Sequence, residues 1–455
     1  MAMGKRKSHD QQTLFIPTAK LPQSAAHPFY AKLNEVLAGW KFDEVVEGLC
    51  AKFYEEKIGR PSLAPGKYFR LLLIGYFEGI DSERGIAWRC SDSLSLRSFV
   101  GYRLDELSTE HSTISRTRRL IDVETHREVF QWVLKVLADY DLIQGKTVGI
   151  DATTLEANAA MRSIVRKDTK QNYQEFLTDL ARASGIETPT REDLAKLDRT
   201  RKNKASNDDW ENPNDSDAKI AKMKDGSTHL AHKAEHAVDM ESGAVLAVTL
   251  QGADKGDPTT LIETIVAATE NLRAVADDVR TEEKLDENWM SEVAADKGYH
   301  SNGSMTDLRE MNIRSYVSEP KRKRRNWKDD PDARAAVYAN RRRIRGKRGK
   351  HLMCKRGELI ERSFAHSYET GAMRRTYLRH HDNIAKRLFV HIGGFNLGLV
   401  MRRLIGIGKP RRLQGLAALI FGWVSAVWEA VSMFWMTCKH WPTENAIPVA
   451  IKMAA

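Results

Sequence analysis

The chain has 455 residues, of which 42% are hydrophobic, and a formal net charge of +11 at pH 7. This length predicts two or three domains, and the hydrophobic content is enough to fill real cores, which excludes a disordered protein. The four cysteines are scattered without the paired spacing of a metal site, which predicts a reducing compartment and no disulfide framework.

The positive charge is concentrated in one stretch. Residues 321–356 contain sixteen Lys/Arg and three Asp, a net charge of +13, which leaves −2 for the rest of the chain. This distribution predicts a polyanion bound at one place rather than a generally basic surface. A disordered basic loop is the alternative at this point.

The N-terminal part is expected to be helical after a polar tail. Residues 1–27 carry no apolar signal segment, whereas apolar residues recur at helical spacing across 28–142. Within this region, residues 109–119 resemble a turn followed by a short basic helix, as in a DNA-reading helix-turn-helix, although an ordinary exposed basic helix has the same pattern.

A short apolar strand is predicted at Thr147–Leu155. Val148 and Ile150 alternate with Gly149 and Asp151, which is strand periodicity. Burying an aspartate is costly, so Asp151 needs a hydrogen-bond donor, a cation or a metal ion. The simplest alternative is that Asp151 caps the turn that follows.

A second strand at 292–296 repeats this theme and ends in Asp296. Between the two strands lie a charged segment, 158–228, that we interpret as an insertion, and then a predicted hairpin and helix. These elements predict an α/β fold, a mixed sheet covered by helices. Ligands of such sheets gather at the carboxyl ends of strands, where we expect Asp151 and Asp296 to lie.

A third carboxylate follows the basic stretch. Glu358 and Glu361 lie three residues apart on a predicted helix with an apolar stripe. Asp151, Asp296 and Glu361 can together hold two Mg²⁺ ions, or Mn²⁺, and such a pair of ions clamps a phosphodiester during in-line displacement. Glu358 remains a rival for the third position.

Several of these stretches carry a family resemblance. Ile150–Thr153, Ala295–Tyr299 and Ile360–Phe364, in this order, resemble the DDE transposases of bacterial insertion sequences, and so do Gly371–Arg375 and Gly394–Leu397. The N-terminal His111–Arg116 is similar to the helical domain of the same group. The likeness spans residues 28–405. Relatives often place Tyr, Arg and Lys around the glutamate, where this chain has Cys354, Gly357 and Tyr368.

The resemblance implies an RNase H-like mixed sheet with flanking helices over 143–405, preceded by an all-α DNA-binding domain at 28–142. It implies cleavage at transposon ends and strand transfer into target DNA, with Asp151, Asp296 and Glu361 as catalytic metal ligands. A homodimer or larger assembly on DNA, in the bacterial cytoplasm at the nucleoid and without a membrane, is expected. The DNA-binding residues would be Arg116, Arg118, Arg119, Lys321, Arg322, Arg324, Arg341, Arg342, Arg343, Arg345, Lys347, Arg348, Arg362, Arg374 and Arg375.

Three other functions compete with this one. The same core could stop at hydrolysis as a nuclease, or the chain could be an inactive DNA-binding remnant. His232-Lys233-Ala234-Glu235-His236 matches a zinc peptidase pattern that requires a helix. Here the flanking residues alternate as in a strand, which would separate the two histidines by about 13 Å, too far for one zinc ion.

The C-terminal segment 406–455 is expected to contain an apolar helix. Its nearly apolar run, 415–428, has 14 residues. A membrane span needs about 18 or more, so a buried or interfacial helix is the better interpretation.

Overall fold

The computed structural model describes residues 27–413, apart from 56–61, 202–205, 224–225, 322–326 and 328–329. Almost all of the predicted polar tail and of the C-terminal apolar helix therefore lies outside the described residues, and so do Arg322 and Arg324.

The N-terminal region is helical, as the apolar spacing predicts. It contains α1 (Pro28–Gly39), α2 (Phe42–Cys50), η2 (Ala51–Phe53), α3 (Pro65–Glu78), α4 (Glu83–Ser91), α5 (Leu94–Val100), α6 (His111–Leu120) and α7 (Val123–Asp139). Helix α3 is the centre of this bundle, because nearly all of its side chains are buried. Ser82, Ser93 and Asp122 begin α4, α5 and α7 by accepting backbone N–H bonds, which satisfies free donors at each helix start.

The sheet is mixed, as predicted. Its strands are β1 (Thr147–Glu156), β4 (Lys219–Lys222), β5 (Thr228–Asp239), β6 (Val245–Gly252), β7 (Glu292–Ala295) and β8 (Arg314–Val317). The order is β4-β5-β1-β7-β8, and β6 also pairs with β5. Strand β5 is antiparallel to β1, whereas β7 is parallel to β1 and β8 is parallel to β7.

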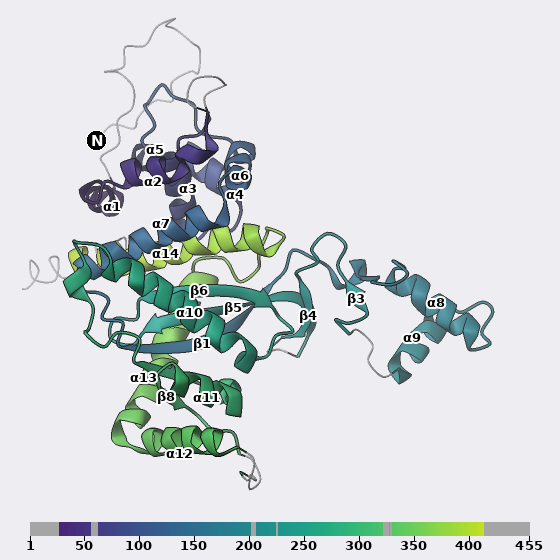
Figure 1. Cartoon of the computed structure of the whole chain (residues 1–455). Coiled ribbons are helices and arrows are strands. Elements are labelled where there is room, and N and C mark those ends of the chain that lie inside the picture. Colours follow the sequence, from purple (N-terminus) through teal and green to yellow (C-terminus); the bar gives the residue numbers. More distant parts are fainter. Residues whose placement is uncertain are drawn as a thin grey trace, which may run out of the picture. The chain divides into compact units, whose positions relative to one another are not determined.

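Helices cover both faces of this sheet. Figure 1 shows α10 (Asp257–Ala276) lying across the strands. On the other face lies α13 (Lys347–Phe364), which continues into a π-helical turn, η6 (Ala365–Glu369). Between β7 and α13 come η5 (Lys297–Tyr299), α11 (Asn302–Glu310), β8 and α12 (Pro331–Arg345). From Pro331 on, the basic stretch is therefore helical rather than a disordered loop.

Helix α14 (His381–Ile405) joins the sheet to the N-terminal helices. It contacts α7, α3 and β6, and Figure 1 shows α7 and α14 side by side. Within the described residues it is the one helix long and apolar enough to cross a membrane, yet 72% of its most apolar window is buried inside the protein. Its apolar composition is therefore explained by packing in the core.

The insertion between β1 and β5 has a small core of its own. It contains η3 (Met161–Ser163), β2 (Val165–Arg166), α8 (Tyr173–Ala183), α9 (Arg191–Thr200) and β3 (Trp210–Glu211). Trp210 is 2% exposed and packs with Ile164, Leu230 and the partly buried Phe176. A second small group of buried apolar side chains lies at Leu177, Ala181 and Leu194, so the segment has buried apolar contacts although it is highly charged.

Candidate active site

Asp151 lies on β1, and Asp296 directly follows the adjacent strand β7. The parallel register of β1 and β7 pairs Ile150 with Ala295, so each carboxylate follows one member of that pair. Asp151 is not at a strand end as expected, since β1 continues to Glu156, but it is the first residue beyond the stretch paired with β7. Burial raises the pKa of Asp151 above its ordinary value, and the charge of Asp296 adds to the rise. Two like charges held this way favour a bound cation.

Arg356 of α13 supplies a positive charge at this position. Its Nη1 donates to Asp151 Oδ2 at 2.7 Å, while the backbone N–H of Ala152 donates to Asp151 Oδ1 at 2.8 Å. The guanidinium opposes the rise in the pKa of Asp151. A cation that binds Asp151 through Oδ2 would have to displace Arg356.

Gly149 explains how α13 comes so close to the acids. A Cβ at this position would lie 3.3 Å from Ile360 Cδ1, 3.4 Å from Arg356 Cγ and 2.6 Å from Met240 Sδ. A larger residue would therefore displace the Met240 side chain and crowd the two side chains of α13 by a few tenths of an ångström. The missing side chain at Gly149 makes room for the close approach of α13 to β1.

The third predicted acid is on this helix but is not next to the two aspartates. Glu361 is exposed, and within the described part of the chain it has no ion-pair partner. At 3.6 residues per turn it points about 140° away from Arg356 around the helix axis. Its rival Glu358 is 65% exposed and pairs with Arg362. The structure thus brings two of the three acids together, and the choice between Glu361 and Glu358 stays a prediction.

His236 anchors the end of the helix that carries Glu361. It lies opposite Asp151 in the β1–β5 register, fully buried. Its Nδ1 lies 2.9 Å from Ser363 Oγ, and its Nε2 lies 2.6 Å from Tyr368 Oη. Burial lowers the pKa of His236 to about 3, so the ring is neutral. Sequence reasoning placed His236 only in the peptidase pattern and missed this role.

The glutamate of that pattern, Glu235, is a structural anchor on the opposite face of the sheet. It accepts hydrogen bonds from Thr260, Thr264 and Tyr299, the last at 3.1 Å, and Lys233 Nζ lies 2.8 Å away. Because Tyr299 comes three residues after Asp296, this contact fixes the turn that carries the second acid. Both histidines of the pattern lie on strand β5, so the helix that a zinc peptidase needs is not present here.

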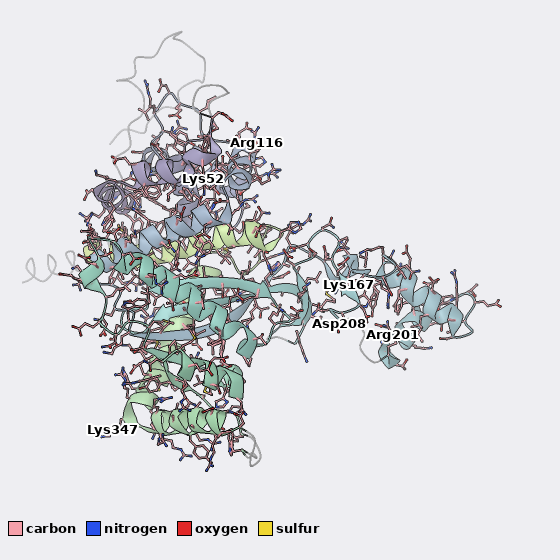
Figure 2. The ribbon with its side chains drawn as sticks, viewed as in Figure 1. Lys52, Arg116, Lys167, Arg201, Asp208 and Lys347 are labelled. Carbon is pink, nitrogen blue, oxygen red and sulfur yellow. The ribbon has the colours of Figure 1, made fainter. Side chains whose placement is uncertain are left out.

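The basic residues of α6 differ in how they are used. Arg116 and Arg119 are exposed, and Arg116 is labelled in Figure 2. Arg118 is buried instead, and its guanidinium donates to Glu83 at 2.7 Å and to Asn383 at 2.6 Å. In this conformation Arg118 joins α6 to α4 and α14 and is not available to DNA.

The basic stretch likewise contains both exposed basic residues and residues that bind other parts of the protein. Arg342, Arg345 and Lys347 (Figure 2) are exposed and have no acidic partner among the described residues. Four other predicted DNA contacts have protein partners: Arg341 pairs with Glu319, Arg343 donates to the carbonyl of Ser315, Arg348 pairs with Glu292, and Arg362 pairs with Glu358.

The remaining basic residues fall into the same two groups. Lys321 is exposed. Arg374 binds Glu369 and Thr153 of β1, and Arg375 lies 3.7 Å from Glu156. Arg374 and Arg375 therefore hold the segment before α14 against β1.

Comparison with known protein families gives a match at the N-terminal end of the chain. A family model described as a transposase domain (DUF772) matches residues 18–120, which include α1 to α6 and stop before the sheet. No curated protein and no solved structure matches the chain. The N-terminal match supports a transposase role, with the DNA binding that such a role implies.

Proposed function

We propose that the protein is a DDE transposase that cleaves DNA at transposon ends and transfers the freed strand into target DNA. The observation that carries the proposal is that Asp151 lies on β1 and Asp296 directly after the neighbouring parallel strand β7, in a chain whose N-terminal helices match a transposase domain. The mixed sheet with both acids on its parallel half supports an RNase H-like core.

The donor set fits magnesium or manganese. Asp151 and Asp296 offer carboxylate oxygens, which these cations prefer, and they repel each other when no cation is bound. When bound, two such ions supply charge stabilisation to the attacking and leaving oxygens of a phosphodiester. Asp151 and Asp296 would hold them, and Glu361, which points away from both in this conformation, is the proposed third ligand. The π-helical turn η6 directly after α13 is a feature often found at functional sites.

The chain's own residues have three further tasks. Arg356 neutralises Asp151 until a cation arrives, which keeps a buried charge compensated. His236 holds Ser363 and Tyr368, so the helix end stays on the sheet. Arg342, Arg345 and Lys347 remain free to bind phosphates, as do Arg116 and Arg119 on α6.

We further propose that the working unit is a homodimer or larger assembly on terminal inverted repeats, in the bacterial cytoplasm at the nucleoid. Inverted repeats on both sides of the coding sequence would support this assignment. Their absence would favour a nuclease or an inactive remnant.

The test is a joining assay with supercoiled plasmid and labelled transposon ends in Mg²⁺. We expect joined products from the unmodified chain and from Asp307→Asn, a control at an exposed aspartate of α11. Asp151→Asn should reduce both cleavage and joining by more than about 100-fold, because changes even in outer-shell partners of a metal cost roughly 10–100-fold. Nicks without joining would identify a nuclease, and activity retained by Asp151→Asn would refute the site.

A further inference from the structure

A second group of metal-ligating side chains lies away from the candidate active site. Asp215 and Asp217, which lie between β3 and β4, and His380, just before α14, each offer one ligand atom, and these atoms all lie within 4.8 Å of one another. His232 of β5 is next to this group and lies opposite Leu155 of β1 in the strand register. Leu155 is four residues beyond Asp151, which places His232 about 13 Å along the strand direction from Asp151.

Part of this arrangement is explained by helix capping. The backbone N–H of His380 donates to Asp215 Oδ1 at 3.3 Å, and that of His381 donates to Asp217 Oδ2 at 2.9 Å. Carboxylates are favourable at a helix N-terminus, so these two contacts alone require no ligand.

Capping does not explain the other side of Asp215. Its side chain and that of His232 are both 0% exposed, and Asp215 Oδ2 lies 3.6 Å from His232 Nε2. Neither atom has a hydrogen-bond partner within the part of the chain that the structure describes, although His232 Nδ1 lies 3.1 Å from His381 Nε2. Asp215 is thus a fully buried carboxylate with one long backbone N–H bond on Oδ1 and an imidazole 3.6 Å from Oδ2, and a cation bound at Oδ1 would offset the remaining cost of burying its charge.

We propose that Asp215, Asp217 and His380 bind a divalent transition-metal ion of the zinc class, with water completing the coordination and His232 positioning Asp215 from behind. His380 Nδ1 lies 4.0 Å from an oxygen of each aspartate. Ligand atoms of a tetrahedral zinc site lie about 3.4 Å apart, given bonds of about 2.0–2.1 Å. A small rotation of the exposed His380 side chain closes this difference. The imidazole selects such an ion over magnesium.

The ion would join two parts of the chain. Asp215 and Asp217 belong to the insertion, whereas His380 precedes the helix that packs against the N-terminal bundle (Figure 1). A metal at this point would hold the insertion to the start of α14. Its role is therefore structural, and it does not depend on the proposed transposase activity.

The test uses the full chain with Asp151→Asn and Asp296→Asn, which removes the candidate catalytic ligands. We expect this protein to bind one equivalent of Co²⁺ with the visible absorption of a nitrogen- and oxygen-ligated ion, and Zn²⁺ to displace it. Adding Asp217→Asn and His380→Ala should abolish binding, whereas adding Asp208→Asn, at an exposed aspartate of the same insertion (Figure 2), should not. Equal Co²⁺ binding after the Asp217 and His380 substitutions, or no binding at all, would overturn the proposal.

A second measurement needs no substitution. Zn²⁺ should slow the modification of His380 by diethyl pyrocarbonate in the unmodified chain, because a ligated imidazole nitrogen cannot react. An unchanged modification rate at saturating Zn²⁺ would also overturn the proposal. Circular dichroism of each variant checks that a loss of binding is not a loss of folding.

Discussion

The two faces of the central strands treat buried carboxylates in different ways. On the α10 face, Glu235 is 0% exposed and is surrounded by three hydroxyl donors and the ammonium of Lys233. On the α13 face, Asp151 is 29% exposed and has one guanidinium partner and a second acid beside it. A buried carboxylate whose oxygens all have donors stabilises the fold. A carboxylate with fewer donors and a second acid beside it is better suited to bind a cation.

The largest expected effect on stability is on the α10 face, where Glu235 has its full set of hydrogen-bond donors. Glu235→Ala should lower the free energy of unfolding by about 3–5 kcal/mol, because the buried hydroxyl of Tyr299 loses its acceptor and Lys233, which keeps Asp257 at 2.8 Å, loses the other of its two carboxylates. Urea denaturation measures this loss. Glu263→Ala, at an exposed position of α10, is the matched control and should change stability by less than about 0.5 kcal/mol. Equal stabilities for the two variants would remove the contrast between the faces.

A smaller effect concerns the neutral histidine opposite Asp151. The pKa of His236 falls from 6.5 to about 3 on folding, so below pH 6.5 the unfolded chain binds a proton that the folded chain does not. The folded state therefore has its full stability above pH 6.5. As the pH falls below this value, the free energy of unfolding decreases by about 1.4 kcal/mol per pH unit, or roughly 2 kcal/mol by about pH 5. His236→Gln should lack this dependence. Parallel stability curves for the two proteins would contradict a neutral, buried His236.

A substitution of Arg356 tests whether the α13 face is a cation site. If its guanidinium occupies the position that a cation needs, Arg356→Gln should tighten Mn²⁺ binding in the absence of DNA. We expect about a tenfold change, equivalent to ~1.4 kcal/mol, since one charged hydrogen bond no longer has to be broken. Titration calorimetry measures the affinity. Weaker binding in the variant would mean that Arg356 supports the metal site instead of blocking it.

The smallest effect per residue is expected in the basic stretch. Replacing Arg342, Arg345 and Lys347 with alanine should reduce the slope of log K against log salt by about 0.9 for each phosphate that the protein no longer neutralises. Arg341→Ala is the control, because Arg341 already pairs with Glu319 at 2.7 Å. A slope changed by the control but not by the triple variant would move the DNA-binding surface elsewhere on the protein.

Local periodicity in the sequence was enough to predict the two strands that position Asp151 and Asp296. The alternation around Ile150 and the short apolar run before Asp296 each specify a strand, and parallel strands bring their following residues together. The contact between Arg356 and Asp151 joins residues 205 positions apart, so no local pattern reveals it. The same holds for His236, whose partners lie 127 and 132 residues away.

Two other features could not be predicted from the sequence, each for a physical reason. The insertion folds around two small groups of apolar side chains, one at Trp210 and one at Leu177, Ala181 and Leu194, which are too few to predict from the sequence that this charged segment has a core. The basic residues look alike in the sequence, yet Arg118 is buried while Arg116 and Arg119 are exposed. Only the helix orientation separates a structural arginine from one that is free to bind phosphate.

Iron-mediated backbone cleavage tests the central claim most directly. Fe²⁺ in place of Mg²⁺ generates radicals that cut the chain next to the bound ion. If Asp151 and Asp296 share a cation, cuts should appear near both residues, and excess Mg²⁺ or Asp151→Asn should suppress both. Cuts near only one of the two aspartates, or cuts that survive Asp151→Asn, would contradict a shared site.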